Sequence, residues 1–271
     1  MYDRLNAVLE TVRGMVGAPK QPTSAGAQPE PVLAARAEAP AAHANGNRAM
    51  FDRIAPSYDR MNKLMSLGID RRWRARVVGM LERVVGTSHD PAVLDLCAGT
   101  MDIAAAVETA YPAARVVACD ASPNMLLRGA GKVKRVEAVV GDALALPFPD
   151  DSFDAVVCGF GVRNLADLGK GMREVRRVLR PGGIFLTLEL FQPRAATTRL
   201  VHGAGLKYVL PVMGAAIAGD RDAYAYLADS MAGFVTRPAY ELQLAAEGFT
   251  RVNAVDLTLG MLAIVEATKP S

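Results

Sequence analysis

Short apolar runs alternate with segments of helical spacing from about residue 48 to the end of the chain. The apolar runs have the length of buried strands and lie at 92–97, 114–120, 135–142, 152–160 and 184–190. Between and around them, apolar residues recur every three or four positions, which predicts amphipathic helices at 49–65, 71–85, 101–110, 165–179 and 238–247. Strands alternating with helices in this way predict βαβ units around a parallel sheet that is buried on both faces. The pattern therefore predicts a three-layer α/β domain with a helical cap at its N-terminal side.

Local turn signals predict several element boundaries. Ser122 and Pro123 have the residue types of a helix cap and a first helical residue, so a helix is expected to begin there. The sequence RPGG at 180–183 predicts the end of the helix that precedes it. Residues 194–234 have the pattern of further helices, and residues 251–268 predict two final strands.

The N-terminal part of the chain differs in composition from the rest. Residues 1–16 have the apolar spacing of one short amphipathic helix, which is either docked on the domain or frayed at the terminus, or else anchored on a membrane surface. Residues 17–47 are rich in Ala and Pro and have little to bury, which predicts a disordered linker. The compact domain is therefore expected at 48–271.

Composition narrows the class of protein. The chain has 271 residues with a formal charge of +3, and its Lys and Arg residues are scattered, so composition gives nucleic-acid binding no support. Cys97, Cys119 and Cys158 lie in apolar runs without metal or disulfide spacing, which predicts reduced thiols in a cytosolic protein. The three histidines lie far apart, so no zinc site is expected. No apolar run reaches the ~18 residues of a membrane span.

Acidic residues stand where the predicted strands end. Asp95 and Asp120 close the first two strands, with Asp142 and Glu189 near the ends of later ones. Because open α/β sheets bind ligands at the carboxyl ends of their strands, these acids are candidates for one site, although each alone is also an ordinary strand-end or capping residue. The loop after the first strand has Gly99 but lacks the G-x-G-x-x-G fingerprint of dinucleotide binding.

A nucleoside without a diphosphate fits these loops better than a dinucleotide. Asp120 is placed to accept both hydroxyls of a ribose, while Asp142 and the backbone N–H of Ala143 are placed to read an adenine. S-adenosylmethionine is a ligand of this kind.

Several longer motifs occur together in the same chain. They are MFDRIAPSYD at 50–59 with Asn62, DRRWR at 70–74, DALALPFPD at 142–150 with SFD at 152–154, FGVRN at 160–164, the common RVLRPGG at 177–183, and a segment at 219–230. With these motifs, residues 50–269 resemble the UbiE/MenG family of class I methyltransferases, which C-methylate the quinone head group in ubiquinone and menaquinone synthesis. The resemblance implies a three-layer Rossmann-like fold with a seven-stranded, mostly parallel sheet and a terminal antiparallel strand.

The same resemblance implies S-adenosylmethionine as the cofactor and assigns residues to it. Asp95, Gly99 and Thr100 are expected around its methionine end, Asp120 at the ribose, Asp142 and Ala143 at the adenine, and Gly159 beside it without a side-chain contact. The family loop reads Gly-Thr-Gly-Asp, whereas this chain has Met101 in place of the second glycine. A bulky Met is expected to need an unstrained φ and room, so either the loop shifts or the cofactor sits differently.

Three residues are candidates for the chemistry on the acceptor. Arg163 follows the fourth strand, and its fixed charge suits a phenolate or a water that takes a proton, unless a neighbouring acid uses it in a salt bridge. Tyr58 and Asn62 lie in the N-terminal helical segment, which covers the site in this family, and suit hydrogen bonds to the head group, although packing alone would also favour a Tyr.

Other functions stay open at this point. The acceptor is expected to be a small-molecule quinone or another phenolic or polyketide compound, because a fold does not dictate a substrate. A protein with altered cofactor use, serving as an assembly partner, is the alternative that Met101 favours. We expect a cytoplasmic protein with no nucleic-acid partner; transient contact with the inner membrane face and a homodimer both stay open.

Overall fold

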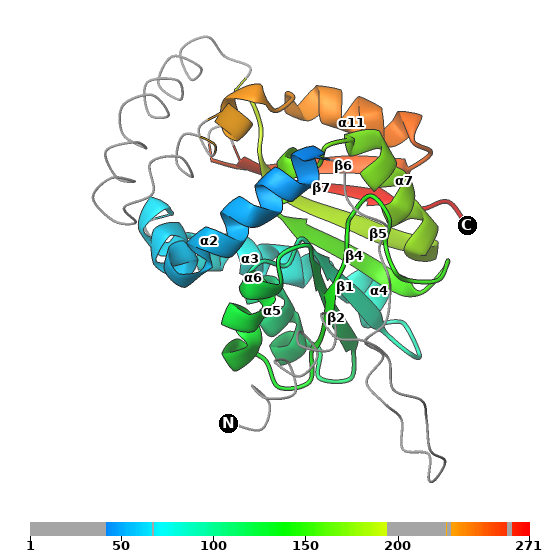
Figure 1. Ribbon diagram of the computed structural model, residues 1–271. Coiled ribbons are helices and arrows are strands. Elements are labelled where there is room, and N and C mark those ends of the chain that lie inside the picture. Colours follow the sequence, from blue (N-terminus) through cyan, green and yellow to red (C-terminus); the bar gives the residue numbers. More distant parts are fainter. Residues whose placement is uncertain (1–41, 67, 194–225, 227–228, 259–261) are drawn as a thin grey trace, which may run out of the picture.

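The computed structural model describes residues 42–66, 68–193, 226, 229–258 and 262–271 (Figure 1). In this part of the chain one seven-stranded sheet has the strand order β3-β2-β1-β4-β5-β7-β6. The strands are β1 (Ala92–Leu96), β2 (Arg115–Asp120), β3 (Glu137–Val140), β4 (Phe153–Gly159), β5 (Leu179–Leu190), β6 (Thr250–Thr258) and β7 (Leu262–Thr268). Strand β7 runs antiparallel to both of its neighbours, whereas the other pairs are parallel. The predicted mostly parallel sheet with a terminal antiparallel strand is confirmed.

Helices cover both faces of the sheet (Figure 1). Apolar side chains of α3 (Asp70–Met80), α4 (Glu82–Val85), α5 (Asp102–Ala110) and α6 (Pro123–Gly129) belong to a core cluster on one face. Those of α7 (Leu168–Val178) and α11 (Arg237–Ala246) belong to the cluster on the other face. Every residue of β1 is buried, as expected for a central strand between two helical layers. The molecule therefore has three layers, as the sequence predicts.

Some boundaries differ from those predicted. Helix α2 (Ala42–Met65) begins well before residue 49, so residues 42–47 are helix and not linker. The predicted helix at 71–85 is two helices, α3 and α4, which meet at Leu81. Strand β5 follows α7 directly and includes the RPGG sequence, where its register with β4 shifts. The predictions for residues 1–41, and for nearly all of 194–228, lie outside the described residues.

The cap of α6 is as predicted and has a further role. Ser122 precedes the helix, and its hydroxyl oxygen accepts a hydrogen bond from the backbone N–H of Met125 at 3.1 Å. The same hydroxyl donates to Asp52 of α2 at 2.6 Å. A residue at the carboxyl edge of the sheet thus binds the N-terminal helix.

A second attachment lies further along α2. Asp59 accepts a hydrogen bond from the hydroxyl of Thr100 at 2.6 Å and forms an ion pair with Lys132 at 2.9 Å. Lys132 belongs to η1 (Ala130–Lys132) and also pairs with Asp102 at the start of α5. These contacts hold α2 across the carboxyl ends of the strands, where it can form the wall of a site. In the described part of the chain, no helix is both long and apolar enough to cross a membrane.

Candidate functional site

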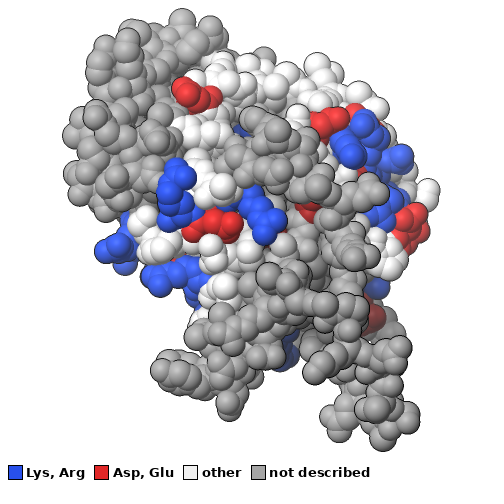
Figure 2. Space-filling model, viewed as in Figure 1, with Lys and Arg blue, Asp and Glu red and all other residues white. Residues whose placement is uncertain are grey.

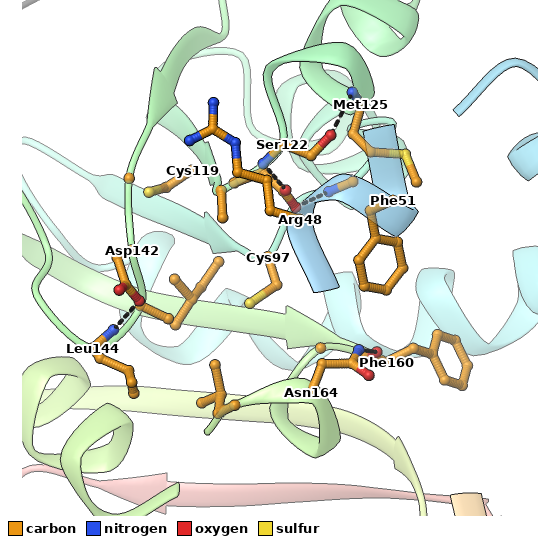
Figure 3. Close-up of a pocket in the computed structure, with 18 of the residues that line it drawn as sticks. Arg48, Phe51, Cys97, Cys119, Ser122, Met125, Asp142, Leu144, Phe160 and Asn164 are labelled. Atoms are coloured by element: carbon orange, nitrogen blue, oxygen red, sulfur yellow. Dashed lines mark hydrogen bonds between the residues drawn. The ribbon is translucent and has the colours of Figure 1, made fainter. Parts of the chain in front are cut away.

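A pocket, which we call the edge pocket, lies between α2 and the carboxyl ends of β1, β2, β3 and β4 (Figure 3). Its lining includes Arg48, Phe51 and Tyr58 from α2, Cys97 and Gly99 after β1, Asp120 at the end of β2 and Ser122 after it, Asp142, Ala143 and Leu144 after β3, and Gly159 at the end of β4 with Phe160, Gly161 and Asn164 after it. Figure 3 shows Asp142 and Leu144 at one end of the pocket, with Phe51 and Phe160 at the other. The strand ends meet at one edge of the sheet, so four loops far apart in sequence build one cavity.

The loop after β1 is tightly wound. Cys97, Gly99 and Met101 all have positive φ, at 55°, 51° and 60°. The backbone N–H of Gly99 donates to the carboxylate of Asp120 at 2.8 Å, and the Tyr58 ring lies against Gly99, where an added Cβ would be 3.7 Å from its Cε1. The loop therefore brings backbone, and not a bulky side chain, to the floor of the pocket.

Two predicted carboxylates line the pocket. Asp120 accepts hydrogen bonds from the backbone N–H groups of Gly99 and Ser122, both at 2.8 Å. Burial raises the pKa of Asp120, and these two bonds partly offset that rise. Asp142 accepts from the N–H of Leu144 at 2.9 Å, which fixes its side chain at the other end of the cavity. The predictions that placed Asp120, Asp142, Ala143, Gly99 and Gly159 in one site agree with this geometry.

Two other residues that were expected around the methionine end of the cofactor, Asp95 and Thr100, lie behind the wall of the edge pocket. Asp95 is 1% exposed, and its carboxylate accepts the backbone N–H of Ala104 in α5 at 2.9 Å. Burial raises the pKa of Asp95 to about 7. Thr100 is also buried, and its hydroxyl donates to Asp59 and accepts from Lys132. Neither residue is among the described residues that line the pocket. They hold the wall in place.

Met101 keeps the backbone conformation that suits glycine. The expectation of an unstrained φ is wrong, since Met101 adopts the left-handed region at φ 60° and ψ 30° and caps α5. Its side chain is 1% exposed and packs into the core below the loop. There it meets Gly129 of α6, where an added Cβ would lie 3.0 Å from Met101 Cε and 2.5 Å from the carbonyl oxygen of Thr100. The loop after β1 keeps its path because Gly129, which has no side chain, leaves room for the side chain of Met101.

A second cavity, which we call the helix pocket, adjoins the first. Its volume is about 240 Å³, against about 110 Å³ for the edge pocket. Its lining is Met50, Phe51, Ile54, Tyr58, Asn62 and Ser66 from α2 and the turn after it, Asp70, Trp73 and Arg74 from α3, and Phe160, Arg163, Asn164, Leu190, Tyr226 and Met231. Phe51, Tyr58, Phe160 and Asn164 line both cavities. The three predicted catalytic residues, Tyr58, Asn62 and Arg163, all lie here.

Polar side chains of the helix pocket lie among its aromatic and aliphatic ones. The side chain of Asn62 lies close enough to the Tyr58 hydroxyl to influence its ionisation. Burial raises the pKa of Tyr58, while Asn62 and the nearby charge of Arg163 counteract that rise. The hydroxyl of Tyr226 donates to the side-chain oxygen of Asn164 at 3.0 Å. This hydrogen bond orients the Asn164 side chain toward Tyr226 in the pocket.

Besides Asp70 and Arg74, which pair with each other, the helix pocket is lined by one further charged residue of the described chain, Arg163. Its guanidinium pairs with Glu189 at 2.6 Å, and their side chains are only 8% and 0% exposed. Burial would lower the pKa of Arg163, but Glu189 more than offsets this effect, so the pKa stays above its ordinary value. Of the buried side-chain nitrogens and oxygens in the described residues, only Arg163 Nε has no hydrogen-bond partner. The salt bridge to a neighbouring acid, the alternative role for Arg163 that the sequence offers, is therefore present. The guanidinium still has one N–H group, on Nε, without a hydrogen-bond partner.

The sequence does not single out several residues of these cavities. Arg48 extends from α2 over the edge pocket, and Phe51 and Phe160 form its boundary with the helix pocket (Figure 3). An Arg near a helix start has the pattern of a solvated charge, and the two Phe residues have the pattern of core positions. Phe51 stands inside the MFDRIAPSYD motif, and Phe160 and Asn164 stand inside FGVRN, so membership in a motif was the one available signal for these three residues.

Comparison with known proteins gives consistent findings. The model of the ubiE/COQ5 methyltransferase family matches residues 41–269. The demethylmenaquinone methyltransferase of Thermus thermophilus is 41% identical over 82% of this chain and all of its own length. The ubiquinone/menaquinone biosynthesis C-methyltransferase UbiE of Paracoccus denitrificans is 39% identical over 79% of this chain and 87% of its own.

A solved structure supports the fold. A SAM-dependent methyltransferase from Thermotoga maritima, described as a possible histamine N-methyltransferase, matches with a TM-score of 0.57 at 15% identity. The match covers 82% of this chain and 99% of that one.

The Met101 backbone strain can be measured with two variants. Met101→Ala and Met101→Gly both remove a buried side chain, which should lower the free energy of unfolding by about 2–5 kcal/mol. Only glycine relieves the left-handed φ, so Met101→Gly should be more stable than Met101→Ala by about 1 kcal/mol. Urea unfolding measures both. An alanine variant that equals or exceeds the glycine variant in stability would show that the backbone at this position is not strained.

The raised pKa of Asp95 predicts a pH-dependent stability. An ordinary Asp has a pKa near 4, so with a folded pKa of about 7 the native chain binds its proton more tightly than the unfolded chain does. This group's contribution to stability therefore falls as pH rises from about 4 to about 7. Relative to the unmodified chain, Asp95→Asn should gain on the order of 1–3 kcal/mol between about pH 5 and about pH 8. Urea unfolding at both pH values tests this, and a pH-independent difference contradicts it.

Proposed function

The chain belongs to the ubiE/COQ5 methyltransferase family, and from this membership we propose that it methylates a ring carbon on the reduced head group of a menaquinone or ubiquinone precursor. It is an S-adenosylmethionine-dependent methyltransferase. The observation that carries the choice of acceptor is Arg163, a buried cation with an unpartnered N–H in an apolar pocket. Such a group suits an oxygen that becomes negative during the reaction.

The edge pocket fits the cofactor. Asp120 has carboxylate lone pairs beyond the two that its backbone bonds use, and these suit the ribose hydroxyls. At the far end, Asp142 and the backbone of Ala143 suit an adenine, with Leu144 beside it. The Tyr58 end of the pocket, where Gly99 lies, then takes the methionine part. When bound, S-adenosylmethionine supplies an electrophilic methyl group on its sulfonium.

The helix pocket fits a flat aromatic acceptor. The rings of Phe51, Trp73 and Phe160 give it apolar walls, with Trp73 and Phe160 at a centroid distance of 6.4 Å. Tyr58 and Asn62 offer hydrogen-bonding groups on one side, and Arg163 offers its N–H groups. Because four residues line both cavities, a ring held in the helix pocket lies next to the Tyr58 end of the edge pocket. Placement of this kind supplies most of the rate gain in a direct group transfer.

Arg163 provides the charge that the chemistry requires. Loss of a phenolic proton from the hydroquinone pushes electron density to the ring carbon that accepts the methyl group. The guanidinium stays charged, since Glu189 keeps its pKa above the ordinary value, and it favours the phenolate over the phenol. Once the ring carbon has accepted the methyl group, it would release its own proton to water, as the phenol does in the first step, and the ring would become aromatic again.

Glu189 sets the position of Arg163. One carboxylate oxygen accepts from the guanidinium at 2.6 Å and from the backbone N–H of Leu190 at 2.9 Å. The other accepts from the backbone N–H of Arg163 at 3.4 Å. The arginine therefore meets the acceptor with little freedom left to lose.

The direct test is turnover by the purified chain. With S-adenosylmethionine and a reduced demethylnaphthoquinone that carries a short isoprenoid tail, mass spectrometry should detect one added methyl group on the ring. A matched naphthol without the second hydroxyl serves as the control acceptor. Methylation of an unrelated soluble phenol, together with no turnover of the quinol, would assign the chain to another acceptor class.

Removal of the Asp120 carboxylate should weaken cofactor binding. Asp120→Ala leaves the ribose hydroxyls without partners, which should cost about 1–3 kcal/mol of binding free energy. Isothermal titration calorimetry with S-adenosylmethionine measures the loss. Met101→Gly is the matched control, because that side chain points away from the edge pocket and its dissociation constant should stay within about twofold. An unchanged affinity for Asp120→Ala contradicts the proposed ribose contact.

Loss of the Arg163 charge should act on turnover more than on cofactor binding. Arg163→Gln should lower kcat by about 10²-fold or more, as expected when a preorganised group no longer stabilises a developing negative charge. The dissociation constant for S-adenosylmethionine should stay nearly unchanged, since Arg163 lines the helix pocket and not the edge pocket. Steady-state kinetics and calorimetry provide the two readouts. If kcat is preserved, Arg163 has only the structural role of pairing with Glu189.

A further inference from the structure

The turn between α2 and α3 carries an unusual concentration of positive charge. We call residues 60–76 the α2–α3 corner. It contains six Lys and Arg residues and one acid, a formal charge of +5, whereas the whole chain carries +3. The rest of the chain is therefore negative by two. The basic residues are not scattered evenly, which corrects the expectation from composition.

The single acid of the corner already has polar partners within the corner. Asp70 is 8% exposed, accepts the hydroxyl of Ser66 at 2.8 Å and pairs with Arg74 at 2.8 Å. The other basic side chains of the corner are exposed and make no ion pair with the described residues. They are Arg60 and Lys63 on α2, and Arg71, Arg72 and Arg76 on α3. Figure 2 shows Lys and Arg side chains gathered over the end of α2.

Helix α3 separates its two faces sharply. Asp70, Val77 and Val78 are buried, whereas Arg71, Arg72 and Arg76 are exposed. In a helix of 3.6 residues per turn, positions 71, 72, 75 and 76 lie along one side. The arginines therefore form one outward stripe that no described residue neutralises.

An apolar side chain stands at the tip of the corner. Ile69 is 44% exposed, one of two large apolar side chains that are exposed in the described residues. Gly68, at φ 76°, lets the chain leave α2 and turn sharply into α3, and its N–H donates to the carbonyl oxygen of Lys63 at 3.0 Å. The hydroxyl of Ser66 also braces this turn by accepting from the Gly68 N–H at 3.2 Å. Two hydrogen bonds therefore brace the turn beside this exposed aliphatic side chain, and Arg71 and Arg72 follow it closely in sequence.

The same two helices line the helix pocket from the inside. Asn62 and Ser66 at the end of α2, and Asp70, Trp73 and Arg74 at the start of α3, belong to its lining. The cationic face and the pocket wall are thus opposite sides of one pair of helices. A surface that binds the outside of the corner lies a helix thickness from the cavity.

We propose that the α2–α3 corner docks the protein on an anionic lipid surface, with Ile69 entering the headgroup region and the arginines pairing with lipid phosphates. Each basic side chain near an anionic leaflet is attracted to the lipid headgroups. An apolar side chain that inserts at the interface adds a hydrophobic contribution to binding. The consequence for turnover rests on the proposed function, since a quinone with an isoprenoid tail resides in the bilayer. The docking itself does not rest on it.

The experiment measures binding of the full chain to vesicles. Flotation compares phosphatidylcholine vesicles with vesicles that also contain phosphatidylglycerol. The corner variant is Arg71→Glu with Arg72→Glu, two exposed residues outside both pocket linings. The matched control is Lys170→Glu with Arg251→Glu, which makes the same change of charge on exposed residues of α7 and β6. Melting curves of both variants verify their folding.

The expected result is selective loss of binding. The corner variant should bind anionic vesicles at least tenfold more weakly, the control variant should stay within twofold, and added salt should weaken the unmodified chain. Ile69→Ser should also reduce binding without any change of charge. Equal binding by both charge variants overturns the proposal and assigns membrane contact elsewhere in the chain. Tighter binding of an RNA duplex than of vesicles, lost in the corner variant, overturns it in favour of a nucleic-acid partner.

Turnover separates this proposal from the proposed function. On an acceptor dissolved in buffer, the corner variant should keep the kcat of the unmodified chain, whereas on the same head group embedded in anionic vesicles its KM should rise at least tenfold. Equal KM values on vesicles overturn the role in substrate access. If the unmodified chain binds anionic vesicles but methylates neither acceptor, the proposed function fails while the docking surface stands.

Discussion

The placement of α2 across the carboxyl edge of the sheet depends on two carboxylates. Asp52 binds the cap of α6, and Asp59 binds Thr100 and Lys132. Burial alone would raise the pKa of Asp59, but the hydrogen bonds from Thr100 and Lys132 more than offset it and keep the group charged. Without these contacts the strand ends and their loops would still form, yet the edge pocket and the helix pocket would lack a common wall.

The sequence predicts the sheet well because a strand that is buried on both faces must be an apolar run. The polar residues at the ends of these runs stand out from them and are candidates for a site. Asp120 and Asp142 could be recognised for this reason, as could Gly99 after β1. The positions of Asp95 and Thr100 could not, because the direction of each side chain depends on partners from other elements, Ala104 for one and Asp59 for the other. Arg48 was missed because an Arg near the start of a helix carries no signal of the cavity below it.

Met101 illustrates how a departure from a motif can be absorbed elsewhere. The left-handed φ costs free energy, while burial of the side chain against Gly129 returns it. Considered without its neighbours in space, Met101 predicts a shifted loop or a displaced cofactor. The compensation lies on α6, which only the fold brings next to this loop. A residue that departs from a motif at a position with positive φ must therefore be judged together with the residues that its side chain packs against.

The wall that the two cavities share couples the two binding sites. Phe51 and Tyr58 border both cavities, and both belong to α2. Any movement of α2 would therefore change the space in both cavities together. A substitution at Phe51 or Tyr58 alters the walls of two binding sites at once, so its effects on the two ligands are coupled.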